Sequence, residues 1–327
     1  MKIALIASGY HPIPPISSSI LTLIQGYKDF LEKEGHQIDI FNHQDVHLVI
    51  DKINNNNYDF VHLHNGGFVL DFSLSLQQKF CFTSHAGHLL KKHQWNDSFR
   101  QEFQYYLNTP GIIALSPASK QLFLDAGYGG YLSTQVNGIN TTKINYQKQG
   151  NGRAICLGWI QPRKQQRLLA EIVDGNLAID FVGPLDDLSF KEGLTTKYLG
   201  VWSSEEVFQH LTDYSCLILI SDGEVAPLVV MEAMAAGLSV VVSISASANL
   251  HTQDFIRVVP DDILTDASAE NKKNVCELIK ETINKNKLLR PEINAYAIEH
   301  FDFNHITKNY IRNVDNFINF WDANLMQ

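Results

Sequence analysis

Short apolar runs alternate with amphipathic segments along most of the chain. Residues 2–7 are almost uniformly apolar and predict a buried strand, while apolar residues recur at helical spacing over 17–34 until Gly35 ends the pattern. Alternation of this kind predicts βαβ units around a parallel sheet, and uniformly apolar runs are typical of strands covered by helices on both faces. The further strands predicted in this half of the chain are 37–41, 58–63, 79–83 and 111–115.

The alternation restarts after the polar, glycine-rich stretch 147–152, which is the best candidate for a linker. We therefore predict two α/β domains, 1–148 and 149–300, followed by a core-facing helix within 301–327. Two such domains are expected to face each other across a cleft that binds ligands at the carboxyl ends of the strands. In the second domain we expect strands at 154–157, 178–182, 216–220 and 240–243 and a helix at 227–236.

Composition removes several classes of protein from consideration. The 327 residues carry a net charge of −9, which argues against a nucleic-acid partner. No apolar run is long enough to span a membrane, and the first strand is too short for a signal-peptide core. The thirteen histidines include no HExxH pattern, so we expect no metal site. The four cysteines lie in separate apolar runs without a CxxC pair, which is typical of reduced core cysteines in a cytoplasmic protein.

The strongest chemical signal is the segment 221–237, SDGEVAPLVVMEAMAAG, which follows a strand and opens a helix. Pro227 suits the first helical position and Gly237 suits the position after the helix. The helix is apolar on all sides except at Glu232, and a buried carboxylate is costly unless something pairs with it. Backbone N–H groups at the helix start form an anion site, which would leave Glu232 and the preceding Glu224 to accept hydrogen bonds from sugar hydroxyls. The residues predicted to surround the anion are Ala226, Pro227, Leu228 and Val229.

This segment resembles the retaining glycosyltransferases of family four, which have the two-domain GT-B fold. Their hallmark is two glutamates separated by seven residues and followed by a small-residue stretch and glycine, here Glu224 and Glu232 before AMAAG. The resemblance implies that Glu224 contacts the donor sugar and Glu232 the nucleotide ribose. Weaker matches cover most of the remaining chain, in the expected order, at 136–140, 158–164, 181–184 and 198–200.

The resemblance also implies that 1–148 forms the acceptor side and 149–300 the nucleotide-sugar donor side, and that the helix within 301–327 packs back on the N-terminal domain. It extends to other residues of both sides. It implies that Lys164 binds the donor diphosphate, where a fixed ammonium would stabilise the leaving group without a metal, and that His85 lies beside the reacting sugar. Gly183 is expected in the base-side wall of the donor site, although it also fits a simple strand end. His64 and Asn65 are candidates for the acceptor side, with a structural turn as the alternative. Ser116 is interpreted as a helix cap.

Two departures from the family pattern fall on the donor phosphates. Trp159 stands where the family has arginine, and Arg163 from the same loop is the candidate replacement. Serines 17–19 stand where the family has a Gly-Gly loop, so Ser17 and Ser18 would offer N–H and hydroxyl donors at the start of the first helix.

The predicted function is therefore metal-independent transfer, with retention, of a sugar from a UDP- or GDP-sugar to a hydroxyl acceptor. A saccharide, a lipid-linked intermediate and a small molecule all remain candidate acceptors, and the region around 91–93 is a candidate for peripheral membrane contact. The alternatives are a non-catalytic homologue that binds nucleotide-sugar or a partner enzyme, and a nucleotide-sugar epimerase. A dinucleotide-dependent dehydrogenase does not fit, because Gly9 does not begin a GxGxxG motif.

Overall fold

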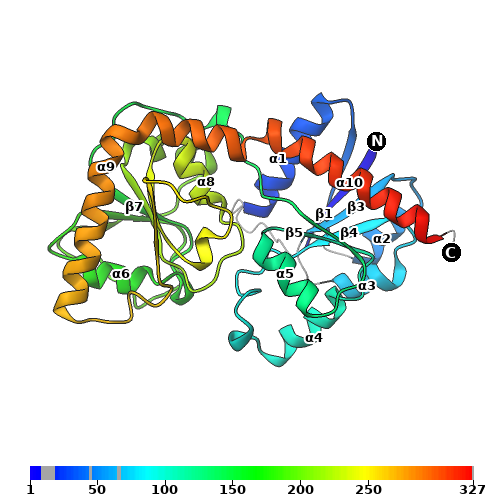
Figure 1. Ribbon diagram of the computed structural model, residues 1–327, viewed down its shortest axis with the longest axis horizontal. Coiled ribbons are helices and arrows are strands. Elements are labelled where there is room, and N and C mark those ends of the chain that lie inside the picture. Colours follow the sequence, from blue (N-terminus) through cyan, green and yellow to red (C-terminus); the bar gives the residue numbers. More distant parts are fainter. Residues whose placement is uncertain (9–18, 44–45, 65–67, 326–327) are drawn as a thin grey trace. The chain divides into compact units, whose positions relative to one another are not determined.

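The structure, a computed structural model, describes residues 1–8, 19–43, 46–64 and 68–325. The chain forms two compact units (Figure 1): unit 1 comprises Met1–Ile139 and Phe303–Gln327, and unit 2 comprises Asn140–Asp302. The division lies earlier than the polar stretch around 148, because the intervening residues bond to unit 2. Asn145 N donates to Phe208 O at 2.8 Å, and Asn151 N donates to Asp213 O at 2.7 Å.

Unit 1 is built on a six-stranded parallel sheet in the order β2-β1-β3-β4-β5-β6. The strands are β1 (Lys2–Ser8), β2 (Gln37–His43), β3 (Phe60–His64), β4 (Phe80–Thr83), β5 (Gly111–Ala114) and β6 (Tyr131–Thr134). The helices are α1 (Ser19–Lys33), α2 (Val46–Asn54), α3 (Val69–Ser75), α4 (Asp97–Tyr106), α5 (Pro117–Asp125) and α10 (Phe303–Leu325). Ser116 caps α5 in a capping box with Ser119, which confirms the predicted cap.

Helix α10 packs within unit 1, although it is the last element of the sequence. Phe303, Tyr310 and Phe317 are buried along one side of the helix. Polar contacts fix it further: Tyr131 donates its hydroxyl to Asn313 O at 3.0 Å, and Lys79 Nζ lies 2.6 Å from Asp322 Oδ1. Unit 1 is therefore assembled from two segments that are separated in the sequence by the whole of unit 2.

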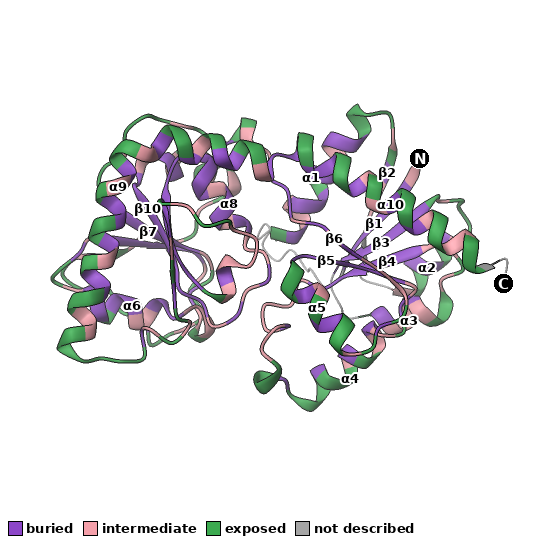
Figure 2. Ribbon diagram, in the orientation of Figure 1, coloured by how far each residue is buried: buried purple, intermediate pink, exposed green. Residues whose placement is uncertain are grey.

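Unit 2 repeats the architecture with a second six-stranded parallel sheet, in the order β12-β11-β10-β7-β8-β9. The strands are β7 (Ala154–Leu157), β8 (Ile179–Val182), β9 (Thr196–Tyr198), β10 (Cys216–Leu219), β11 (Ser239–Ser243) and β12 (Ile256–Val259). The helices are α6 (Gln166–Val173), α7 (Ser204–His210), α8 (Leu228–Ala235) and α9 (Ala269–Phe301). In both sheets the central strands are buried while the helices keep exposed outer faces (Figure 2), as the sequence pattern predicts. All four cysteines are buried and free, as expected.

A buried arginine on α9 holds together the part of unit 2 behind α8. Arg290 is fully buried, and its partners among the described residues are neutral oxygens. The guanidinium donates to Tyr214 O and Thr212 O at 2.7 Å, to Gln147 O at 3.0 Å and to Ala236 O at 3.1 Å. These acceptors belong to the residues before β10, to the segment entering unit 2 and to the C-terminal end of α8. Burial lowers the pKa of Arg290 from its usual value.

Candidate functional site

The order in which strands are added to the sheet of unit 2 reverses between β7 and β10. The connection from β7 leads through α6 to β8 on one side, whereas the connection from β10 leads through α8 to β11 on the other. In open parallel sheets, ligands bind outside the carboxyl ends of the strands at such a switch point. The loop after β7 carries Arg163 and Lys164 in a short 3-10 turn, and the loop after β10 carries Glu224.

These three charged side chains meet at the switch point. Glu224 Oε1 lies 3.3 Å from Arg163 Nη1 and 3.6 Å from Lys164 Nζ. The Arg163 guanidinium also donates to the Ser221 hydroxyl at 3.2 Å and to the carbonyl of Gly223. The Lys164 and Glu224 side chains are only 15% and 12% exposed, so charge interactions here are stronger than in open water. Two cations therefore share the Glu224 carboxylate.

The loop after β7 is held in shape by two consecutive glutamines. Gln165 adopts the left-handed conformation, with φ of 56°, and its side chain donates to Asp261 O at 2.6 Å. Gln166 donates to Trp159 O at 2.6 Å across the loop. The backbone of Asp222 donates to Arg163 O at 2.8 Å, which joins the loops after β7 and β10. No motif in the sequence indicates this role for the glutamines.

Gly183, predicted in the base-side wall, lies at the same sheet edge as Gly158. A Cβ on Gly183 would fall 2.1 Å from Gly158 O, and its φ of +139° disfavours other residues. The carbonyl of Gly183 accepts a hydrogen bond of 2.9 Å from the Tyr198 hydroxyl. Gly183 thus has a firm structural reason to be glycine, and its contact with a nucleobase stays a prediction.

Helix α8 begins at Leu228, one residue later than predicted. Pro227 occupies the N-cap with an extended backbone (φ −70°, ψ 114°), so its prediction as the first helical residue is wrong. The fixed φ of proline suits both places, and the sequence pattern alone does not separate them. Pro227 gives the helix no side-chain cap, so the N–H of Val229 receives no capping side-chain acceptor, while Val230 N donates to Pro227 O at 3.2 Å. Gly237, with φ of +87°, follows the helix as expected.

Glu232 is the acidic residue of the otherwise apolar α8. Its side chain is partly exposed, yet among the described residues its carboxylate has no hydrogen bond and no ion pair. Desolvation raises the pKa of Glu232 to about 7. A carboxylate in such a place accepts hydrogen bonds readily from any ligand that enters.

Trp159 takes the place of the arginine expected from the family pattern. It follows the end of β7 and is 44% exposed. Arg163, predicted as the replacement cation, lies within ion-pair distance of Glu224. The loop therefore offers two cations where the pattern alone suggests a deficit.

In unit 1 the carboxyl ends of β3 and β4 bring His64 and His85 together. His64 Nδ1 lies 3.1 Å from His85 Nε2. Burial lowers the pKa of His85 to about 4 and the pKa of His64 well below its usual value, so both rings are neutral near pH 7. The remaining first-unit candidates, Asn65, Ser17 and Ser18, lie outside the described residues.

His62, two residues before His64, belongs to a different network. Its Nδ1 lies 3.0 Å from the hydroxyl of Tyr310 on α10, and its Nε2 lies 2.8 Å from Thr83 Oγ1. Thr83 donates its hydroxyl proton to Ile113 O at 2.7 Å, so it accepts from the Nε2–H of His62. The remaining nitrogen, Nδ1, then accepts from Tyr310. His62 is therefore a structural residue that ties α10 to the sheet.

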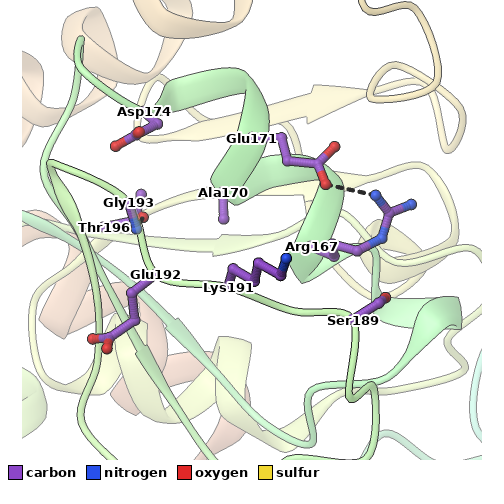
Figure 3. A pocket seen from close by; sticks show the side chains of 9 residues that line it. All are labelled: Arg167, Ala170, Glu171, Asp174, Ser189, Lys191, Glu192, Gly193 and Thr196. Carbon is purple, nitrogen blue, oxygen red and sulfur yellow. Dashed lines mark hydrogen bonds and ion pairs between the residues drawn. The ribbon is translucent and has the colours of Figure 1, made fainter.

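A surface pocket of about 280 Å³ lies elsewhere in unit 2, between α6 and the segment before β9 (Figure 3). Among its charged residues, Arg167 Nη1 lies 2.6 Å from Glu171 Oε1, and two carboxylates accept backbone N–H groups: Asp174 from Thr195 at 2.9 Å and Glu192 from Tyr198 at 2.7 Å. It contains none of the predicted site residues, so we attach no ligand to it. In the described part of the chain, no group of three metal-binding side chains comes together and no helix is long and apolar enough to cross a membrane.

Comparison with known proteins identifies the fold. No family model matches the chain, and no curated protein matches it by sequence. Among solved structures, Anabaena HepE in complex with UDP and glucose is 15% identical over 96% of this chain and 99% of that chain, with a TM-score of 0.73. The sucrose-phosphate synthase of Thermosynechococcus elongatus is 14% identical over 95% and 97%, with a TM-score of 0.75.

A third similar structure is AviGT4, a glycosyltransferase of avilamycin A biosynthesis, which is 14% identical over 97% of this chain and 98% of that chain (TM-score 0.72). At these identities the likeness concerns the fold. The predicted class, α/β with two Rossmann-like doubly wound domains of the GT-B type, is confirmed.

Proposed function

We propose that the protein is a metal-independent, retaining glycosyltransferase that uses a UDP- or GDP-sugar and a hydroxyl acceptor. The observation that carries the proposal is the Arg163–Lys164–Glu224 cluster at the switch point of the second sheet. Similar structures include glycosyltransferases, and HepE has been solved with UDP-glucose. A cytoplasmic location and a saccharide, lipid-linked or small-molecule acceptor belong to the same proposal.

In this proposal the donor exchanges partners within the cluster. The diphosphate binds Lys164 and Arg163 together with the N–H groups at the start of α8, where the helix dipole favours an anion. Glu224, released from the two cations, accepts hydrogen bonds from the hydroxyls of the donor sugar. Glu232 accepts from the ribose hydroxyls. The diphosphate thus replaces Glu224 as the partner of the two cations, and the Glu224 carboxylate becomes available to the donor sugar.

Catalysis then rests on charge stabilisation at the leaving group. Negative charge grows on the diphosphate oxygens as the glycosidic bond breaks, and fixed cations and N–H groups stabilise it without reorganisation. The neutral His85 lies beside the reacting sugar, with His64 and Asn65 toward the acceptor. Retention follows from attack of the acceptor on the face that the diphosphate leaves.

Thermal unfolding with a panel of nucleoside diphosphates and nucleotide-sugars tests the proposal. A ligand that binds only the folded protein raises the free energy of unfolding, by about 2.7 kcal/mol at a ligand concentration 100 times its Kd, and therefore raises the unfolding midpoint. We expect one nucleotide class to raise the midpoint, with and without chelator. The absence of a shift with every nucleotide would refute the donor site, and a shift abolished by chelator would refute metal independence.

Trp159, which stands where the family pattern has a phosphate-binding arginine, favours one rival function, a homologue that binds nucleotide-sugar without transferring it. Incubation of the protein with its stabilising nucleotide-sugar, followed by product analysis, separates the alternatives. Release of nucleoside diphosphate indicates transfer or hydrolysis, an isomeric nucleotide-sugar indicates an epimerase, and unchanged ligand with tight binding indicates the non-catalytic homologue.

Replacing Glu232 with glutamine is expected to weaken nucleoside diphosphate binding by about 10-fold or more, because a hydrogen bond to a charged acceptor contributes roughly 1.5–3 kcal/mol. The ribose would bind the ionised carboxylate, whose pKa is about 7 in the free protein. Wild-type affinity should therefore increase as pH rises through 7, with release of a proton, while the affinity of the variant should lack this component. Calorimetry at pH 6 and pH 8 measures both effects, and an unchanged dissociation constant would remove Glu232 from the ribose site.

The raised pKa of Glu232 also predicts a pH dependence of stability. Because the folded-state pKa of about 7 exceeds the ordinary value of 4.5, folding takes up a proton between these values. The stabilisation is present below about pH 4.5 and is lost as pH rises through 7. The difference in unfolding free energy between wild type and Glu232→Gln should change by on the order of 2–3 kcal/mol across this window. Equal slopes of stability against pH for the two proteins would contradict a raised pKa of the Glu232 carboxylate.

Restoring an arginine at position 159 is expected to tighten binding of the nucleoside diphosphate by about 3- to 10-fold, since a charge-assisted bond adds roughly 1 kcal/mol. The uncharged nucleoside should bind equally well to wild type and Trp159→Arg, because the added cation addresses phosphate alone. Trp159→Phe is the matched control for loss of the indole. Weaker diphosphate binding in Trp159→Arg would show that the tryptophan itself contacts the donor.

A further inference from the structure

His64 and His85 form a hydrogen-bonded pair at the carboxyl edge of the first sheet. His64 is the last residue of β3, and its register partner is Thr83, the last residue of β4, two residues before His85. The facing nitrogens are 3.1 Å apart, and the ring centroids are 5.4 Å apart with an angle of 28° between the planes. The pair therefore has hydrogen-bond geometry.

Both rings are neutral near pH 7, because burial lowers both pKa values. In a bond between two neutral imidazoles, one ring carries the proton and the other offers a lone pair. The proton position on His64 Nδ1 therefore dictates the proton position on His85 Nε2, and with it the state of the other nitrogen of His85. His64 is thus coupled to the tautomer of His85.

The ring of His64 is itself held in place by packing. Its centroid lies 3.9 Å from that of His62, which is fixed at both nitrogens by Tyr310 and Thr83. Tyr27 closes another side, with ring centroids 6.4 Å from His64 and 4.7 Å from Tyr310. A residue clamped in this way can impose an orientation on its neighbour.

The second nitrogen of His85 is available to a ligand. His85 is half-buried, and within the described residues its Nδ1 has no hydrogen-bond partner. We propose that His64 is a positioning residue: its hydrogen bond fixes the ring and the tautomer of His85, so that Nδ1 of His85 is presented to a hydroxyl of the reacting sugar. The inference deepens the proposed function and rests on it for the identity of the ligand.

Two substitutions separate the hydrogen bond from the packing. In His64→Asn the side-chain amide places a polar group near the position of the imidazole Nδ1, whereas His64→Leu fills the space without any hydrogen-bonding group. Nitrogen-15 NMR of histidine-labelled protein then reports the tautomer of His85 without any substrate. We expect one dominant tautomer in wild type and His64→Asn, and a changed ratio in His64→Leu.

Turnover of the stabilising nucleotide-sugar gives the functional measurement. His64→Leu should lower kcat by about 10- to 100-fold with little change in KM, and His64→Asn should stay within about 5-fold of wild type. In a His85→Ala background, His64→Leu should have no further effect, because coupled residues are not additive. Thermal midpoints of all variants verify folding.

The outcomes are distinct. An unchanged His85 tautomer in His64→Leu, equal losses in His64→Leu and His64→Asn, or a full effect of His64→Leu in the His85→Ala background would each overturn the positioning role. If wild type turns over no nucleotide-sugar, the proposed function fails, and the NMR comparison alone then decides whether His64 sets the state of His85.

Discussion

Replacing Lys164 with alanine is expected to lower kcat for donor turnover by about 10²–10³-fold, the loss typical of removing one fixed donor from a developing anion. The Lys164 ammonium is largely shielded from solvent and lies 3.6 Å from Glu224, at the edge of the sheet where α8 begins. A cation held there acts most strongly on the departing diphosphate, where charge increases during the reaction. KM should change less than kcat, since Arg163 and the helix N–H groups still bind the ground state.

Two variants make this measurement specific. Lys164→Arg keeps the charge on a differently shaped group and should recover part of the activity. Lys191→Ala removes a lysine from the surface pocket beside α6 and should leave turnover unchanged. If Lys164→Ala retained nearly normal kcat while Arg163→Ala did not, the diphosphate would belong to Arg163 instead.

Replacing Arg290 with methionine is expected to destabilise unit 2 by about 3–5 kcal/mol, the largest effect on stability that we predict. The substitution leaves the carbonyls of Gln147, Thr212 and Tyr214 without their donor, while Ala236 O keeps a hydrogen bond of 3.1 Å from the Thr212 hydroxyl. Each buried acceptor without a partner costs roughly 1–3 kcal/mol, partly relieved by relaxation and entering water. Such a loss is a large fraction of the stability of an ordinary domain.

Hydrogen exchange read by mass spectrometry locates this effect within the chain. Protection should fall throughout 140–302 while unit 1 keeps its protection, because all of these acceptors belong to unit 2. Arg290→Lys should fall between wild type and Arg290→Met, since one ammonium cannot reach every carbonyl. The exposed Arg100 on α4 provides the control substitution. Wild-type protection in Arg290→Met would contradict the role of Arg290.

Residue patterns predicted the elements whose signal is local. Apolar runs such as Ile3–Ala7 and Val240–Val242 are buried strands, as expected, because burial on both faces leaves a continuous apolar sequence. The short strands β6 and β12 were not predicted, and only the strand-end match at 198–200 pointed to β9, since these strands mix buried with partly or fully exposed positions over three or four residues. Helix α9 continues through Pro291 to Phe301. The sequence did not predict this, because proline ordinarily ends a helix.

The candidate site divides in the same way. Glu224 and Glu232 were noticed because they flank or interrupt an apolar helix that follows a strand, and Lys164 was noticed because its segment 158–164 resembles the family pattern. Their mutual distances depend on the order of strands in the sheet, which cannot be read directly from the sequence. Arg290 and Gln165 escaped notice because their partners are backbone carbonyls far along the chain, and a carbonyl has no residue type that a pattern could reveal.

The interrupted order of unit 1 has a consequence for synthesis. Phe303 N donates to Ile139 O at 3.0 Å, so the chain returns to unit 1 beside the point where it left. The whole of unit 2 is inserted in the sequence between these two residues. During translation all of unit 2 emerges from the ribosome before α10, so the hydrogen bond between His62 and Tyr310 cannot form until synthesis has passed unit 2. The domain begun first is therefore completed last, and during translation its sheet lacks the helix that covers Phe60 and His62. A chain truncated after residue 302 would expose that surface, although it would contain every element of unit 2.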